Sequence, residues 1–407
     1  MKRIRPDYYD KFTCIADKCP ITCCQEWKIA VDADTNRKWK KILPPEDVQP
    51  QKKNLSAYTT KKDGIRVIEL EEEHKCPFLN KNKLCKLVTR YGEKVLSETC
   101  TVFPREVHHF ETHEEETLMP CCPAVVDLFA TENTRQIGIK DAAVQSEKAE
   151  LSEEHILFFI RDKIAEMFAE EQYSVRETLL AAFYILSELL RSRGEAGAEN
   201  ELSEQIHTDE EMYRSLIEEY FSVENVKQLR TAIAEIPTDT LASVTEQNEL
   251  LQDLSVNYQK EGLYQKYLNP VIAKAEKLSE LFSDGEETEQ IEKLTEAFET
   301  HFGKYEKLMR NFLLNEIWSD LLLPDSDLEG MVVQYQWIAM EYSVIRHCIF
   351  LHWLLDGQKE IAYDTVRDYI VIICRMMGYD EEDIYEYLEN SFEELIWDWG
   401  YLALVVG

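Results

Sequence analysis

The stretch CPITCCQEW, residues 19–27, places cysteines at positions 19, 23 and 24 and a tryptophan shortly after them. Two adjacent cysteines are poorly placed to bridge each other, because a disulfide needs separated Cα–Cβ vectors that converge. Thiolates at this density are instead the natural ligands of zinc and of iron–sulfur clusters. The stretch therefore predicts a fold whose amino-terminal part is organised around bound metal.

The cysteines are concentrated near the start of the chain. One tetrahedral zinc ion or one cubane cluster takes four thiolates. Because adjacent residues point in different directions, Cys23 and Cys24 are able to serve two different centres. The number of cysteines indicates either two centres or one centre with additional thiols. Nine of the eleven lie at or before residue 122: Cys14, Cys19, Cys23, Cys24, Cys76, Cys85, Cys100, Cys121 and Cys122.

The spacing of these cysteines does not select the metal. It lacks the paired C-x2-C of a zinc ribbon, the run of a bacterial ferredoxin and the C-x3-C-x2-C of radical enzymes that cleave S-adenosylmethionine. Scattered buried cysteines without metal are the alternative, which the density of thiols disfavours. Cys348 and Cys374 lie in apolar helical contexts and are expected to be ordinary buried residues.

Polar residues near the cysteines allow two interpretations each. His108, His109 and His113 are either ligands or the polar face of a strand or loop, and we leave them out of the site. Arg105 either pairs with a carboxylate, such as that of a cofactor, or braces an acidic neighbour.

The composition favours a soluble, helical protein. The 407 residues include only 13 glycines and 12 prolines, so long helices with few breaks are expected. No apolar run approaches the roughly 20 residues that span a bilayer, and the basic start lacks the apolar segment of a secretory signal. We therefore expect a cytoplasmic protein with reduced cysteines and no membrane association.

Charge is distributed unevenly along the chain. Residues 1–130 carry 22 Lys and Arg against 21 Asp and Glu, a net charge of +1, and residues 131–407 carry 23 against 57, a net charge of −34. Because phosphate binding requires a basic surface, nucleic acid is not an expected partner. The acidic part either attracts a lysine-bearing protein substrate or consists of solvated helix faces, and we favour the second interpretation for most of these residues.

The first 130 residues predict a small, loop-rich head that depends on metal for rigidity. Residues 26–35 and 64–73 alternate apolar and polar side chains, as short strands do. Three aromatic residues either form the core of this head or exclude water from the metal, and we favour the core: Trp27, Phe78 and Phe103.

The remaining residues predict helices throughout. Ser174 and Glu177 form a capping box before an apolar run that Gly194 is expected to end. No fixed repeat period is visible, which favours an irregular bundle over a solenoid. The predicted fold class is therefore mainly α, with a small cysteine-rich metal-binding α+β head at 1–130 followed by an acidic, irregular α-helical bundle at 131–407.

Several common active-site motifs are absent from the sequence. It contains no G-x-G-x-x-G, no P-loop and no G-x-S-x-G elbow. It also lacks the glycine-rich turn with which conventional methyltransferases bind S-adenosylmethionine.

Three segments resemble the flagellin lysine-N-methylase family. They are CPITCCQEWKIAVD at 19–32, CPFLNKNKLCKLVTRYGEKVLSETCTVFPRE at 76–106, and CCPAVVDLF at 121–129. The same region resembles a broader family of zinc- or iron-chelating domains with a C-x3-C-C signature. Farther on, YEKLMRNFLLNEIW at 305–318 is similar to the helical region of the methylase family.

This resemblance implies a protein-lysine N-methyltransferase that transfers methyl groups from S-adenosylmethionine to lysine ε-amino groups of flagellin. It also implies a [4Fe–4S] cluster, with zinc as the alternative metal. Cys121 departs from the family motif and is a reserve ligand. The motifs locate neither the S-adenosylmethionine pocket nor a catalytic residue. The implied metal ligands are Cys14, Cys19, Cys23, Cys24, Cys76, Cys85, Cys100 and Cys122.

A non-enzymatic metal-binding protein is the competing function. Such a protein is either a zinc-stabilised interaction scaffold or an iron–sulfur carrier. A third possibility is the same methylase chemistry on a substrate other than flagellin. Metal analysis of anaerobically purified protein shows whether iron or zinc is bound, and mass spectrometry of flagellin detects methyl transfer.

Overall fold

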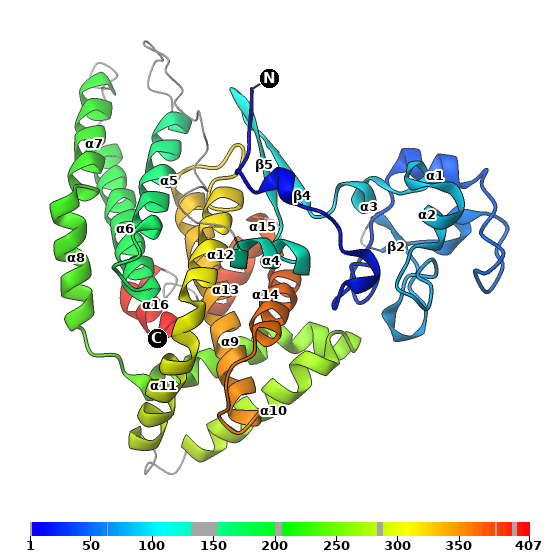
Figure 1. Cartoon of the computed structure of the whole chain (residues 1–407). Coiled ribbons are helices and arrows are strands. Elements are labelled where there is room, and N and C mark those ends of the chain that lie inside the picture. The colour runs from blue at the N-terminus through cyan, green and yellow to red at the C-terminus, as the bar shows by residue number, and fades with distance from the viewer. Residues whose placement is uncertain are drawn as a thin grey trace.

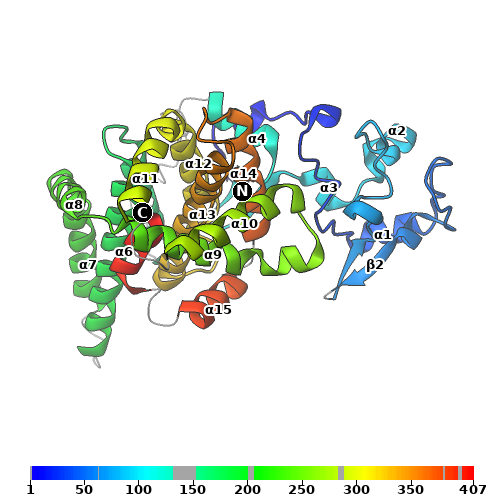
Figure 2. The ribbon, with the colours of Figure 1, turned by 90° about the horizontal axis from the view of Figure 1, so that it is seen from below.

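The computed structural model describes residues 2–62, 64–131, 153–199, 206–282, 288–378, 381–392 and 397–407. The chain forms a small lobe that projects from one side of a large helical lobe (Figures 1 and 2). Helices make up most of the described secondary structure, and the strands are few and short. The predicted mainly α fold with a small α+β head is therefore confirmed.

The small lobe has its own core of aromatic and aliphatic side chains. Phe78 is 1% exposed and its ring packs edge-on against those of Trp39 and Tyr58. The indole N–H of Trp39 donates a hydrogen bond of 2.7 Å to the carbonyl of Val95. The elements of this lobe are α1 (Ala33–Trp39), the antiparallel pair β2 (Thr59–Lys62) and β3 (Ile65–Ile68), α2 (Lys86–Tyr91) and α3 (Glu98–Val102).

One expected strand of the small lobe is only partly present. Residues 64–73 contain β3, but residues 26–35 form isolated bridges, such as that between Ala30 and Val67, and then enter helix α1. Asp32 explains the change, because its carboxylate accepts the N–H of Thr35 at 2.7 Å and so caps the helix.

A three-stranded sheet lies at the edge of the large lobe that faces the small one (Figure 1). It consists of β1 (Lys2–Ile4), β4 (Arg105–His109) and β5 (His113–Leu118) in the order β1-β5-β4. Strand β1 runs parallel to β5, whereas β4 and β5 form an antiparallel hairpin. The histidine-rich segment therefore forms strands, and alternate residues face opposite sides of the sheet.

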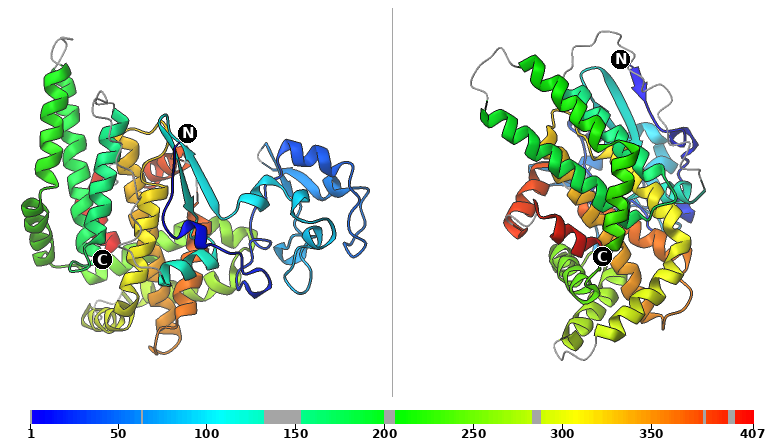
Figure 3. Two further views of the ribbon diagram at one scale, coloured as in Figure 1. Left: turned by 45° about the horizontal axis from the view of Figure 1, so that its top comes forward. Right: turned by 90° about the vertical axis from the view of Figure 1, so that its left-hand side faces the viewer.

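Helix α13 (Leu328–Leu355) is the centre of the large lobe, since nearly all of its residues are buried. Helices α6, α9, α10, α12, α14, α15 and α16 pack against it (Figure 3). The other helices of this lobe are α4 (Pro123–Thr131), α5 (Glu153–Ala169), α6 (Val175–Glu199), α7 (Ile206–Tyr220), α8 (Val223–Glu235), α9 (Thr240–Glu261), α10 (Gln265–Phe282), α11 (Thr288–Phe302), α12 (Glu306–Ser319), α14 (Tyr363–Met377), α15 (Glu381–Phe392) and α16 (Trp399–Val406).

The predicted start of α6 is confirmed and its predicted end is wrong. The backbone N–H of Ser174 donates to the carboxylate of Glu177 at 2.8 Å, and the hydroxyl of Ser174 accepts the N–H of Glu177 at 3.1 Å. The helix passes through Gly194 and continues to Glu199. A glycine inside a helix costs only about 1 kcal/mol relative to alanine, and the surrounding residues favour helix. None of the described helices has the length and apolar character that a bilayer span requires.

The buried residues form two clusters, one in each lobe. Residues from both ends of the predicted head belong to the cluster of the large lobe, among them Tyr8 and Phe110. The ring of Tyr8 contacts Phe129 of α4, and its hydroxyl donates a hydrogen bond to Asn315 of α12. The boundary at residue 130 stays a prediction, but the packing makes the first residues and the β4–β5 hairpin part of the large lobe.

Candidate metal centre

The loop of residues 19–24 is attached by backbone hydrogen bonds to the segment that carries Cys76. The N–H of Cys76 donates to the carbonyl of Cys24 at 2.8 Å, and the N–H of Glu26 donates to the carbonyl of His74 at 2.8 Å. Cysteines about fifty positions apart in the sequence are thereby neighbours in the small lobe.

Two further cysteines are positioned by the starts of short helices. Cys85 is the N-cap residue of α2, and the backbone N–H groups of Leu87 and Val88 partly offset the rise that burial causes in its pKa. Cys100 lies in the first turn of α3, where its N–H donates to the N-cap hydroxyl of Ser97 at 3.3 Å. Backbone N–H groups directed at a sulfur favour its thiolate form.

Four thiols form a group within the small lobe, which we name the head thiol group: Cys24, Cys76, Cys85 and Cys100. Burial raises the pKa of Cys100 to about 11, and Cys85 contributes to this rise. Burial raises the pKa of Cys76 above that of Cys100, and the neighbouring Cys100 and Cys85 contribute to this rise. These thiols are close enough to interact, and within the described residues no lysine or arginine is among the main influences on their pKa values.

A second group lies where the two lobes meet, and we name it the junction thiol group: Cys14, Cys19 and Cys122. Burial raises the pKa of Cys19, with contributions from Cys23 and Cys14. Burial also raises the pKa of Cys122 to about 12, and Cys19 is among its neighbours. Cys122 immediately precedes α4, and the backbone N–H groups of Val125 and Ala124 partly offset the rise in its pKa.

Cys23 lies between the two groups. A hydrogen bond from the Cys24 thiol lowers the pKa of Cys23 to about 7 despite its burial, and the charge of Arg375 contributes. Cys23 interacts with Cys100 of the head thiol group and with Cys122 of the junction thiol group. The structure therefore brings all eight predicted ligands into one region, and adjacent Cys23 and Cys24 adjoin different neighbours. That these thiols bind metal stays a prediction.

Arg375 of α14 connects the helical lobe to this region. Its guanidinium donates hydrogen bonds to the carbonyls of Cys121 at 3.0 Å, Ile21 at 3.0 Å and Thr22 at 3.3 Å. The same group lies 4.9 Å from the ring centre of Trp27. Arg375 is only 5% exposed, so these contacts replace its hydration.

The remaining cysteines lie deeper in the helical lobe. Cys121 is 3% exposed and interacts with Cys122, but also with the buried carboxylates of Glu106 and Glu316. Cys374 and Cys348 are buried in helices, as predicted. Cys121 therefore borders the junction thiol group on the side of the helical lobe.

The three aromatic residues divide between the two lobes, and Arg105 lies over two aromatic rings. Phe78 belongs to the core of the small lobe. Trp27 and Phe103 instead contact each other edge-on, at 4.8 Å between ring centres, and pack against the core of the large lobe. The guanidinium of Arg105 lies over the rings of Tyr9 and Phe12, at 5.7 and 5.1 Å.

A groove of about 620 Å³ separates α3 of the small lobe from the sheet. Its lining includes Val102 of α3, Val107 of β4 and Ile65 of β3, which are all exposed. Ligand sites in proteins have volumes of about 300–1,000 Å³, so the groove is large enough to bind a substrate segment.

The polar residues of this groove are mainly acidic. Four carboxylates line it, against one arginine and one histidine. Arg3 lies 3.0 Å from the carboxylate of Glu114 and 3.5 Å from that of Glu116. The carboxylates are those of Asp32, Glu98, Glu114 and Glu116, and the bases are Arg3 and His109.

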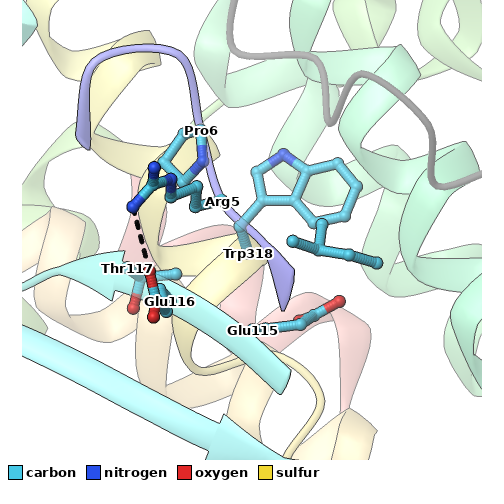
Figure 4. Close-up of a pocket in the computed structure, with 7 residues that line it drawn as sticks. Arg5, Pro6, Glu115, Glu116, Thr117 and Trp318 are labelled. Atoms are coloured by element: carbon cyan, nitrogen blue, oxygen red, sulfur yellow. Dashed lines mark hydrogen bonds and ion pairs between the residues drawn. The ribbon is translucent and has the colours of Figure 1, made fainter. Parts of the chain in front are cut away.

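A much smaller pocket lies beside β1 and β5 (Figure 4). Arg5, Glu116 and Trp318 are among its lining residues, and Arg5 donates to Glu116 at 3.4 Å. Its volume of about 10 Å³ accommodates about one water molecule. This pocket is therefore too small for a cofactor.

Few features of the sequence indicated Arg375 or the groove. The one local sign was an arginine inside the apolar run YIVIICRMM, because arginine is rarely fully buried unless its polar atoms are paired. The groove combines residues from both lobes, so no continuous motif marks it.

Comparison with known proteins identifies a family whose domain matches part of this chain. Residues 161–405 match the C-terminal domain of the FliB lysine N-methylases. The flagellar biosynthetic protein FliU of Salmonella muenchen is 28% identical over 171 residues, which are 39% of this chain and 91% of that protein. The lysine-N-methylases of Salmonella typhimurium strain LT2 and Salmonella choleraesuis are each 27% identical over 154 residues, which are 35% of this chain.

The aligned segment spans only about a third, 34%, of each of these two lysine-N-methylases. No solved structure matches the chain. The matched family domain includes Arg375 and most of the helical lobe.

Proposed function

Because the chain belongs to the FliB lysine N-methylase family, we propose that it methylates lysine ε-amino groups of flagellin. In this proposal S-adenosylmethionine donates the methyl group and a [4Fe–4S] cluster binds to the cysteines of the small lobe. The observation that carries the proposal is the convergence of the eight predicted ligands beside Arg375, a residue of the family domain.

The surroundings of the thiols fit a metal cluster. Backbone N–H groups near Cys85 and Cys122 oppose the rise in the pKa values of these thiols, and N–H groups directed at a sulfur stabilise metal-bound thiolates. The metal ions of a cluster would also supply positive charge beside these thiols, whose pKa values are raised, and would keep them deprotonated. The cysteines present therefore suit bound metal better than free thiols.

The sulfurs are spaced more widely than a single zinc site requires. Zn–S bonds of about 2.3 Å place the sulfurs of a tetrahedral site roughly 3.8 Å apart. In the described part of the chain, no three cysteine sulfurs all lie within 4.8 Å of one another. An iron–sulfur cubane spreads its four thiolates over separate corners, so it requires less contraction of these positions. The head thiol group supplies four such ligands, and the junction thiol group together with Cys23 supplies four more.

The groove beside α3 suits a lysine-bearing segment of flagellin. The exposed side chains of Val102 and Val107 offer apolar contact to the methylene stem of a lysine, and the carboxylates attract its ammonium. Cys100 lies in the same short helix as Glu98 and Val102, so the groove adjoins the head thiol group.

Methyl transfer requires the neutral lysine. The reference pKa of lysine is about 10.4, so the ε-amino group must lose a proton before its nitrogen attacks the methyl carbon. A C–N bond then forms, the C–S⁺ bond of the sulfonium breaks, and S-adenosylhomocysteine leaves. When bound, the cluster would supply redox-active iron held by these thiolates.

Metal analysis and mass spectrometry test the proposal together. The full chain is purified without oxygen, its iron, zinc and acid-labile sulfide are measured, and it is incubated with flagellin and S-adenosylmethionine carrying a deuterated methyl group. We expect iron with sulfide and labelled methyl groups on flagellin lysines. A Cys76→Ser variant is expected to lose iron and activity together, whereas a Cys348→Ser variant should retain both.

Two results would contradict this function. Active protein without iron would exclude the cluster but not the methylase. Zinc-containing protein that transfers no methyl group would instead favour the interaction scaffold.

A further inference from the structure

The face of the sheet that packs on the helical lobe has a cluster of carboxylates around a histidine. Glu106 lies opposite Thr117 and His108 lies opposite Glu115 in the β4–β5 register, so these four side chains share one face. Asp320, at the end of α12, approaches the same face. One ligand atom from each of Glu106, His108 and Asp320 lies within 4.8 Å of the other two.

Two more carboxylates lie behind these residues. Glu316, one turn before Asp320 in α12, and Glu341 of α13 are each 5% exposed. The carboxyl groups of Glu316, Glu341 and Asp320 interact with one another, while Asn315 donates a hydrogen bond to Glu316 at 3.0 Å. The cluster therefore comprises four carboxylates: Glu106, Glu316, Asp320 and Glu341.

No basic side chain compensates this charge. Within the described ranges, neither lysine nor arginine forms an ion pair with any of these four carboxylates, and the nearest base is His108, 3.9 Å from Glu106. The neighbouring Glu115 shows the contrast, because Arg161 binds both of its oxygens at 2.7 Å. Burying several carboxylates without a cation is strongly unfavourable. A cation from outside the chain would offset this charge.

His108 has the arrangement of a metal ligand. It hydrogen-bonds to the backbone of Ser319, while its Nε2 atom is buried and has no hydrogen-bond partner in the described part of the chain. The Nε2 atom lies 3.9 Å from a carboxylate oxygen of Glu106. A ring N–H donated to a carbonyl, with the other nitrogen free, is the usual environment of a metal-binding histidine.

A second buried group lacks a partner beside the cluster. Thr117 is 3% exposed and its hydroxyl makes no hydrogen bond among the described residues. It lies directly across the strand pair from Glu106. A bound ion with its water ligands would satisfy both this hydroxyl and His108 Nε2.

We propose that Glu106, His108 and Asp320 bind a divalent transition-metal cation, with Glu316 and Glu341 behind them neutralised by the same charge. One imidazole with several carboxylates suits Mn²⁺, Fe²⁺ or Zn²⁺, whereas Mg²⁺ and Ca²⁺ prefer oxygen ligands alone. The ion joins β4 to the end of α12. It is separate from the predicted cysteine ligands, and Cys121 interacts with carboxylates of the cluster on one side and with Cys122 on the other.

Binding of Mn²⁺ to the full chain tests this site. Thiolates are poor ligands for Mn²⁺, so the loss of the free-ion electron paramagnetic resonance signal reports the carboxylate site even in a protein rich in cysteine. We expect one Mn²⁺ per chain, and dissociation constants at least tenfold larger for His108→Gln and for Asp320→Asn. His109→Gln is the matched control, because His109 is the next residue of the strand, faces the opposite side and is exposed.

Thermal unfolding separates a metal site from a merely structural cluster. Asp320→Asn removes one of several repelling charges, so the metal-free variant should unfold at the same or a higher temperature than the metal-free parent. Added Mn²⁺ should raise the unfolding temperature of the parent and leave that of the variant unchanged.

Two results would overturn the proposal. One is a parent protein that binds no Mn²⁺ at millimolar concentration. The other is a pair of variants, at His108 and Asp320, that bind it as tightly as the parent. Either would mean that the carboxyl groups share protons among themselves. Neither result bears on the cysteines or on methyl transfer, so the proposed function is tested independently.

Discussion

Replacing Arg375 by methionine is expected to release the loop of residues 19–24 from helix α14. Methionine retains the apolar stem but loses the three hydrogen bonds to the carbonyls of Ile21, Thr22 and Cys121. It also loses the charge above the ring of Trp27. Since these carbonyls are screened from water by the lobes, they gain no equivalent partner while the loop stays in place.

The magnitude follows from these contacts. Each hydrogen bond from a charged donor contributes about 1.5–3 kcal/mol, and a desolvated cation–π contact about 2 kcal/mol. The bond to Thr22 is long, at 3.3 Å, and the contributions are not additive. A total of about 4 kcal/mol is therefore expected, which corresponds to roughly a 10³-fold shift toward the undocked loop at 1.4 kcal/mol per factor of ten.

Hydrogen exchange in reduced, metal-free protein measures this shift without interference from bound metal. Amides of residues 19–27 should lose about three orders of magnitude of protection, in line with the shift estimated above. Arg367→Met is the matched control on the same helix, because Arg367 pairs with Asp127, Asp364 and Asp368, and none of its ion pairs in the described part of the chain involves residues 19–24. If both variants protect residues 19–27 equally, Arg375 does not fasten the loop and the reasoning is wrong.

Two further predictions concern the sheet. Although burial opposes ionisation, Arg161 and His113 lower the pKa of Glu115 to about 2, so the Arg161–Glu115 pair contributes about 3 kcal/mol of stability above pH 4.5 that is lost as the pH falls toward 2. In denaturant unfolding near pH 7, Arg161→Met should remove at least this much stability, and adding Glu115→Gln should restore part of it. An unchanged unfolding midpoint in Arg161→Met would contradict the assignment. In the groove, the double variant Glu114→Gln and Glu116→Gln should raise KM for flagellin several-fold, preserve kcat and weaken the salt dependence of KM. The control Glu111→Gln, in the β4–β5 turn outside the groove, should change none of these. An unchanged KM in the double variant would exclude the groove as the substrate site.

Local patterns were sufficient for the fold class and for the list of candidate cysteines. The Ser174–Glu177 capping box depends only on residues three positions apart, and it forms as predicted. A prediction that depended on a single residue, the end of a helix at Gly194, was wrong. Gly194 lies inside α6 because the residues around it favour helix strongly enough to offset its cost.

The pattern of His108 and His109 shows where local information ended. Strand alternation separates the two histidines onto opposite faces, but it does not say what each face contacts. His108 faces Asp320, more than two hundred positions away, whereas His109 lies beside Glu114 at the exposed groove. The sequence therefore left both histidines with two interpretations, and only the packing of α12 distinguished them.

By itself, the sequence determined a helical protein whose amino-terminal region is dense in thiols, since composition, periodicity and cysteine spacing are properties of short stretches of chain. Tertiary structure alone decided that Arg375 binds the carbonyl of Cys121 across 254 positions. It also decided that carboxylates from β4, α12 and α13 gather without an ion pair to lysine or arginine among the residues that the structure describes. These arrangements depend on which surfaces become buried against each other. That choice is made by the packing of whole elements and leaves no periodic trace in the residues that it joins.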